Sequence, residues 1–120
     1  MKENIAREKS YAFALRIVKL YRWLAEEKKE FVLAKQILRA GTSIGVNVEE
    51  AIGGQSEKDF LAKMAIAYKE ARETHYWLRL LHDGQFIDDP AYESVATDCE
   101  ELLKILGSIT KTMKSKIHNS

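Results

Sequence analysis

Apolar residues recur along the chain at steps of three and four, the spacing that keeps side chains on one face of an α-helix. The pattern divides into four segments, at about residues 4–26, 31–52, 57–81 and 90–116. The sequence contains one proline, so little interrupts helix within these segments. The predicted inward positions are Phe13, Ile17, Leu20 and Leu24, then Leu33, Ile37, Ile44, Val48 and Ile52, then Phe60, Met64, Ala67, Ala71, Leu78 and Leu81, then Tyr92, Val95, Cys99, Leu102, Leu106, Ile109 and Met113.

Capping residues mark the ends of these segments. Ser56 precedes the third segment as a predicted N-cap, and Asp89 followed by Pro90 begins the fourth. Gly53-Gly54 is expected to end the second in a left-handed conformation. Short connections between long helices force neighbours to run antiparallel. The prediction is all-α, an antiparallel up-down-up-down four-helix bundle.

Composition limits the domain count and the environment. The 120 residues, of which 46% are hydrophobic, suffice for a single domain spanning 1–120. No apolar run approaches the roughly 20 residues that a membrane helix needs, so no membrane association is expected. The single cysteine, Cys99, and a charged N-terminal segment lead us to expect a reduced, cytoplasmic location.

A polar stripe accompanies the core face of the second segment, and a matching stripe lies on the third. In an antiparallel hairpin turning near residues 54–56, facing residues have numbers that sum to about 110. This register predicts an ion pair between Arg39 and Glu70. It also places Gln36 opposite Glu73, and Asn47 opposite Lys63. A network that fixes helix register is the favoured interpretation, with a ligand site as the alternative. The stripes consist of Gln36, Arg39, Ser43, Asn47 and Glu50, and of Lys63, Glu70, Glu73 and Trp77.

Gly41 and Gly45 lie one turn apart in the second segment, where each costs roughly 1 kcal/mol relative to alanine. Close approach of another helix, within the bundle or from a neighbouring subunit, would explain them. A tolerated kink is the alternative.

The histidine and cysteine residues do not form a pattern that indicates a catalytic site. The spacing of His75 and His82 does not supply the paired Glu-x-x-His motifs of a di-iron bundle. Cys99 falls on the apolar face without an activating base nearby in sequence. We therefore predict a protein that is not an enzyme, with no catalytic residues, no cofactor and no metal.

Basic and aromatic residues suggest surfaces for binding. A net charge of +1 excludes a positive field over the whole molecule, so any RNA or DNA site would be a local patch. The candidate patch is Lys9, Arg16, Lys19 and Arg22, and the basic end of the fourth segment is a further possibility. Consecutive helical residues point about 100° apart, so at least one large aromatic side chain should be exposed, and a protein interface is favoured over base stacking. The candidate interface aromatics are Trp23, Tyr76 and Trp77.

The run from Gln36 to Ala51, together with Lys69-Glu70-Ala71-Arg72-Glu73-Thr74 and Tyr76-Trp77-Leu78, resembles the small bacterial four-helix-bundle proteins encoded in intervening sequences of 23S ribosomal RNA genes. The chain is similar, more distantly, to accessory proteins of diversity-generating retroelements. The resemblance implies a homo-pentamer around a central channel, with no established enzymatic role. Nucleic-acid association is suggested for the retroelement proteins, which are strongly basic, unlike this chain.

The combined expectation is a self-assembling bundle that acts by binding, as a structural or interaction protein. An RNA- or DNA-binding accessory protein is the alternative.

Overall fold

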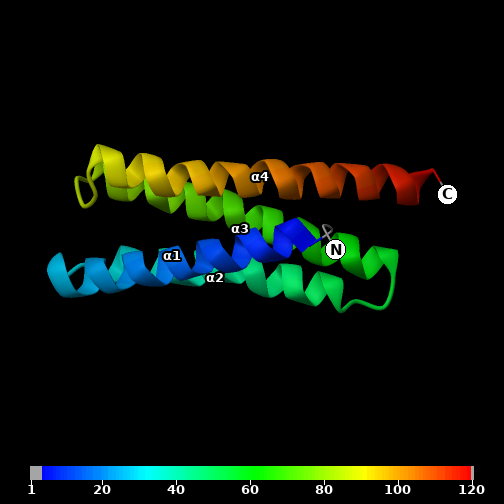
Figure 1. Ribbon diagram of the computed structural model, residues 1–120, viewed down its shortest axis with the longest axis horizontal. Helices are drawn as coiled ribbons and strands as arrows, with labels where there is room; N and C mark the ends of the chain where they lie inside the picture. Colours follow the sequence, from blue (N-terminus) through cyan, green and yellow to red (C-terminus); the bar gives the residue numbers. More distant parts are fainter. Residues whose placement is uncertain (1–3, 120) are drawn as a thin grey trace.

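The computed structural model describes residues 4–119, which form four α-helices: α1 (Ile5–Glu27), α2 (Val32–Ile52), α3 (Glu57–Asp83) and α4 (Asp89–His118). Successive helices run in opposite directions along a rod of 51 × 25 × 21 Å (Figure 1). The predicted all-α four-helix bundle is confirmed, and each helix boundary lies within two residues of its predicted position.

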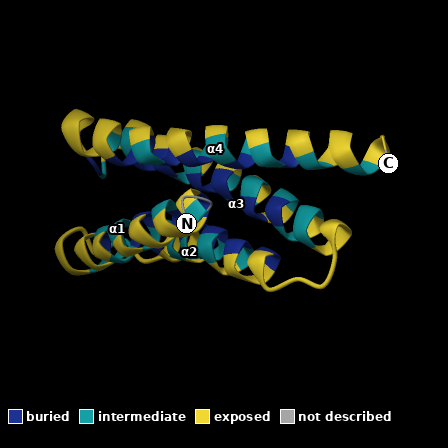
Figure 2. Cartoon of the chain, turned by 45° about the vertical axis from the view of Figure 1, so that its right-hand side comes forward, coloured by how far each residue is buried: buried dark blue, intermediate teal, exposed yellow. Residues whose placement is uncertain are grey.

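The core lies along the axis between the helices, and the exposed residues face outward (Figure 2). α2 packs against both α1 and α3, α3 packs against α4, and the α1–α4 interface is the least extensive of the four. One predicted inward residue, Ile52, is instead exposed, because α2 ends there and buries Ala51. The largest fully buried side chains are Phe13, Ile17, Leu24, Ile37, Ile44, Leu78, Leu81, Leu102 and Leu106.

The two glycines of α2 face α1. A Cβ atom at Gly41 would lie 2.8 Å from Cγ1 of Ile17, closer than real contacts allow. At Gly45 the nearest atom would be the backbone oxygen of Ser10 at 3.6 Å, which is ordinary contact. The predicted close approach therefore occurs within the bundle and requires glycine at Gly41.

The helix caps agree with the sequence at one site and differ at another. The Ser56 hydroxyl accepts a hydrogen bond from the Asp59 backbone N–H at 3.1 Å, as an N-cap should. The N-cap of α4 is Asp88, whose carboxylate accepts from the Ala91 N–H at 2.9 Å. The prediction of Asp89 was wrong by one residue, since the side chain three positions before Ala91 has the capping geometry.

Left-handed backbone occurs away from the glycines. Gly53 has φ −83° and no glycine among residues 4–119 has a positive φ, so the expected left-handed Gly53-Gly54 was wrong. The left-handed residues are Lys29 (φ 54°) and Gln85 (φ 67°), one position beyond the C-caps of α1 and α3. At the second site, the Phe86 N–H donates to the Leu81 carbonyl at 2.9 Å. Both helices thus end in a motif that usually places glycine where Lys29 and Gln85 stand.

Replacing Lys29 or Gln85 by glycine should stabilise the protein by about 0.5–1 kcal/mol each, because glycine adopts positive φ without the steric cost of a Cβ atom. Thermal unfolding of the single variants measures the effect. Lys35→Gly, at an exposed position inside α2, is the matched control and should destabilise by about 1 kcal/mol. A loss of stability in Lys29→Gly similar to that in the control would contradict the explanation.

Candidate functional site

The polar ridge between α2 and α3 centres on Arg39. Its guanidinium donates to Glu70 at 3.2 Å, the predicted pair, and also to Glu73. Glu73 further accepts a hydrogen bond from the Trp77 indole at 2.9 Å. The Trp77 bond and Arg39 lower the pKa of Glu73 below its usual value, and Glu73 in turn raises the pKa of Arg39. One cation therefore holds two carboxylates of the neighbouring helix.

The remaining ridge residues differ from their predicted pairings. Lys63 pairs with Glu50 at 2.8 Å instead of with Asn47. The Asn47 amide donates to the Ser43 carbonyl at 2.9 Å, within α2, and the Ser43 hydroxyl donates to the Arg39 carbonyl. Gln36 is exposed and does not bond to Glu73. The ridge consists of ion pairs and hydrogen bonds within this chain, near its surface. This supports the interpretation of the ridge as a network that fixes the register of α2 on α3.

Two of the four basic residues proposed on α1 are paired with carboxylates of α4. Lys9 pairs with Glu101 at 3.2 Å, and Arg16 pairs with Asp98 at 2.7 Å while also bonding Ser94. These contacts join α1 to α4 and occupy two of the four cations. Lys19 and Arg22 are exposed and form no ion pair within residues 4–119. The carboxylates on the α1 side of α4 are thereby neutralised.

The candidate aromatics have three different environments. Tyr76 is 50% exposed and meets the partly buried Trp77 edge-on, with ring centroids 5.3 Å apart. Trp23 is exposed at the far end of α1, where the Lys28 ammonium lies 5.4 Å from its ring centroid. The expectation that the Tyr76-Trp77 pair exposes one large ring is met by Tyr76.

Sequence reasoning missed two exposed apolar surfaces. The first, here called the α1–α2 apolar strip, consists of Tyr11, Leu15 and Val46, all exposed. Tyr11 and Val46 line a hollow of about 420 Å³ between the two helices. A signal was present, because Tyr11 and Leu15 are one turn apart on the side of α1 away from Phe13.

The second, the α2–α3 apolar strip, consists of Val32, Tyr76 and Leu80, all exposed. The Arg39–Glu70 and Lys63–Glu50 pairs set a register that brings Val32 level with Leu80. The two strips therefore flank α2 on its two sides, and Val46 and Val32 lie about 21 Å apart along that helix.

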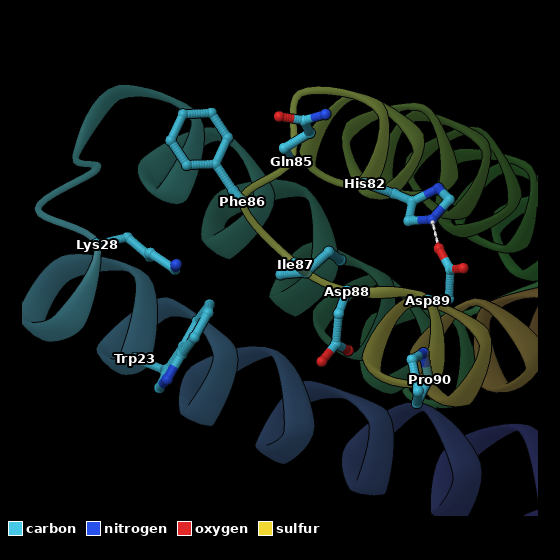
Figure 3. A pocket seen from close by; sticks show the side chains of 9 residues that line it. All are labelled: Trp23, Lys28, His82, Gln85, Phe86, Ile87, Asp88, Asp89 and Pro90. Atoms are coloured by element: carbon cyan, nitrogen blue, oxygen red, sulfur yellow. Dashed lines mark hydrogen bonds and ion pairs between the residues drawn. The ribbon is translucent and has the colours of Figure 1, made fainter.

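A pocket of about 550 Å³ opens where the end of α1 meets the loop between α3 and α4 (Figure 3). Trp23 and Phe86 form apolar walls, and Ile87 lies between them. Its carboxylates have internal partners: Asp88 caps α4, and Asp89 bonds His82 at 2.6 Å. The carboxylates of Asp88 and Asp89 therefore stabilise the connection between α3 and α4.

His82 links that loop to α3 and should make stability depend on pH. The hydrogen bond to Asp89 raises the pKa of His82, and its ring stacks on Tyr92 with centroids 4.4 Å apart. A raised pKa in the folded state contributes stability below the unfolded value of about 6.5, and that contribution disappears as pH rises through the folded pKa. The melting temperature of His82→Gln should therefore fall further below that of wild type at pH 6 than at pH 9, where the loss of the ring stacked on Tyr92 remains. Asp89→Asn should show the same pattern, and a difference independent of pH would contradict it.

Cys99 is enclosed by the core. Its thiol donates to the Ala71 carbonyl at 3.4 Å, and burial raises its pKa to about 12. A thiol in this state is a poor nucleophile. In residues 4–119, no three His, Cys, Asp or Glu side chains gather in a metal-binding arrangement. None of the described helices has an apolar stretch long enough to cross a bilayer.

The fold and these surfaces define a small four-helix-bundle protein whose helices are joined by an apolar core and by ion pairs near the surface. The chain belongs to the family of 23S rRNA-intervening sequence proteins, whose family model matches residues 2–108. The family resemblance read from the sequence is thus confirmed.

A crystal structure with a similar fold comes from Bacteroides thetaiotaomicron. That protein, of the S23 ribosomal protein family and of unknown function, is 53% identical to this chain, with a TM-score of 0.90. The match covers 92% of this chain and 99% of the other. A comparison with curated proteins gives no match.

Proposed function

We propose that this cytoplasmic protein self-assembles into a ring of five bundles and acts by binding instead of by catalysis. The observation that carries the proposal is the pair of exposed apolar strips, one between α1 and α2 and the other between α2 and α3. The α1–α2 apolar strip exposes Tyr11 at 66% and Leu15 at 49%, and the α2–α3 apolar strip exposes Val32 at 72%. Large apolar side chains gathered in this way favour protein interfaces.

Two unlike strips suit a ring better than a dimer. A two-fold dimer presents the same patch from both subunits, whereas a head-to-tail ring joins two different patches. In the proposed ring, the α1–α2 apolar strip of one copy contacts the α2–α3 apolar strip of the next. The expectation of five copies comes from the family resemblance. The poor nucleophilicity of Cys99 supports a non-catalytic role.

Size-exclusion chromatography with light scattering tests the assembly. Wild type should have a mass near five times the 13.8 kDa chain. Leu15→Glu damages the first strip and Leu80→Glu damages the second, so each variant alone should elute as a monomer. Thr97→Glu, at an exposed position on α4, is the matched control and should assemble like wild type.

Mixing the two monomeric variants tests the head-to-tail arrangement. Each retains the strip that the other lacks, so an equimolar mixture should form a one-to-one dimer and stop there. A mixture that stays monomeric, with circular dichroism showing both variants folded, would refute contact between unlike strips. A monomeric wild type would refute self-assembly altogether.

A further inference from the structure

The outer face of α3 and α4 carries cations without partners. On α3 these are Lys69, Arg72 and Arg79, whose spacing of three and seven residues keeps them on one side of the helix. All three are exposed. Lys69 lies near Glu73, which is already bonded to Arg39 and Trp77.

α4 continues the same face. Lys104, Lys111 and Lys114 are exposed and are also spaced by seven and three residues. The His75–Glu100 bond at 3.1 Å sets the register between the helices and brings Lys104 level with the segment from Lys69 to Arg72. Six cations without ion pairs among the described residues thus lie on adjoining sides of two antiparallel helices. We call this the α3–α4 basic face.

The arrangement of acidic residues explains how a nearly neutral chain presents such a face. Asp98 and Glu101 pair with Arg16 and Lys9 of α1, which neutralise them. The carboxylates nearest the basic face are Asp83, Glu93 and Glu100, of which Glu100 is bonded to His75 and Asp83 lies 3.4 Å from His82. The ion pairs with α1 therefore use acidic residues of α4 and leave the cations of the basic face without partners, although the net charge of the chain is only +1.

We infer that the α3–α4 basic face binds the sugar-phosphate backbone of nucleic acid. At 1.5 Å per residue, three cations span about 15 Å on each helix, and duplex nucleic acid carries one charge per about 1.7 Å of its axis. Guanidinium groups such as those of Arg72 and Arg79 match phosphate oxygens in pairs. A membrane surface fits less well, because α4 contributes none of the large exposed apolar side chains that would enter a bilayer. Contacts to phosphate alone predict binding with little sequence preference.

This surface includes the basic end of α4, which the sequence also suggested, but none of the four candidate residues of α1. Charge reversal at each surface shows which one binds. Arg72→Glu/Lys104→Glu alters the α3–α4 basic face, and Lys19→Glu/Arg22→Glu is the matched control with the same change in charge. Binding to a fluorescein-labelled 20-base-pair RNA duplex is followed by anisotropy at 50 mM salt. The first pair should weaken binding at least 10-fold, and the control less than 3-fold.

Salt dependence and competing probes complete the test. With four phosphate contacts, wild-type affinity should fall on the order of 100-fold between 50 and 200 mM salt. A DNA duplex of equal length distinguishes RNA from DNA as the source of the phosphates, and binding to either supports the inference. Equal losses in both variant pairs, no binding at 50 mM salt, or binding to phosphatidylserine vesicles without duplex binding would each overturn it. Light scattering of both variant pairs shows whether assembly is unchanged, because Arg72 lies one helical turn from Tyr76 of the α2–α3 apolar strip.

Discussion

Replacing Gly41 by alanine should destabilise the protein by about 1–3 kcal/mol, although alanine is the better helix former. The new methyl group would lie 2.8 and 2.9 Å from the two γ carbons of Ile17. Ile17 is fully buried and branched at Cβ, so its side chain cannot turn away without entering other core atoms. Urea unfolding at pH 7 measures the change.

Gly45→Ala provides the control one turn further along the same helix. Its added carbon would meet only ordinary contacts, so the variant should gain up to about 1 kcal/mol from helix propensity. The cause of the Gly41 effect is tested in an Ile17→Ala background, which itself should cost about 2–5 kcal/mol. There, Gly41→Ala should become neutral or stabilising. A loss that persists without the Ile17 side chain would show that the contact is not responsible.

Arg39→Glu should cost about 2–3 kcal/mol at pH 7, because it removes the shared partner of Glu70 and Glu73 and adds a third carboxylate. The Arg39 side chain is 48% exposed, so solvent screening keeps the loss below that of a buried pair. Glu70→Lys in the same chain should restore part of the stability by reversing the pair. Chemical unfolding of both single variants and the double variant gives the coupling energy, and additive losses would contradict the network.

The same network should respond to acid. The pKa of Glu73 is lowered in the folded protein, so its contribution is present above the unfolded value of about 4.5 and is lost as pH falls through the folded value. The stability difference between wild type and Arg39→Glu should therefore shrink below about pH 4. A constant difference from pH 7 to pH 3 would count against an electrostatic origin.

The register of α2 on α3 could be predicted because polar residues on both helices follow helical spacing and a short turn joins them. Arg39 and Glu70 illustrate this. The partner of Lys63 could not be predicted, since Asn47 and Glu50 both lie within reach of a long side chain. In the structure, Lys63 pairs with the carboxylate of Glu50. Which of the two adjacent aspartates caps α4 likewise depends on backbone angles, and the residue types alone do not determine these. In the structure the N-cap is Asp88.

The candidate surfaces were harder to predict because they depend on which helices are neighbours around the bundle. Periodicity places Lys9 and Arg16 on α1 but does not show that α4 directs Glu101 and Asp98 toward them. Once those pairs form, unpaired positive charge remains on the opposite side of α4. The apolar strips were missed for a related reason: the spacing places Tyr11 and Leu15 away from Phe13, but only the packed structure shows that no other helix covers them.

The buried thiol of Cys99 can serve as a probe for the separation of α3 from α4. It is the chain's single cysteine, and it lies at the α3–α4 interface with its sulfur against the Ala71 carbonyl. An alkylating reagent can reach it only when these helices separate, so the labelling rate measures the population of the open form. Opening of the bundle can thus be measured in the protein without any substitution. A ligand that holds α3 and α4 together would slow the alkylation of Cys99.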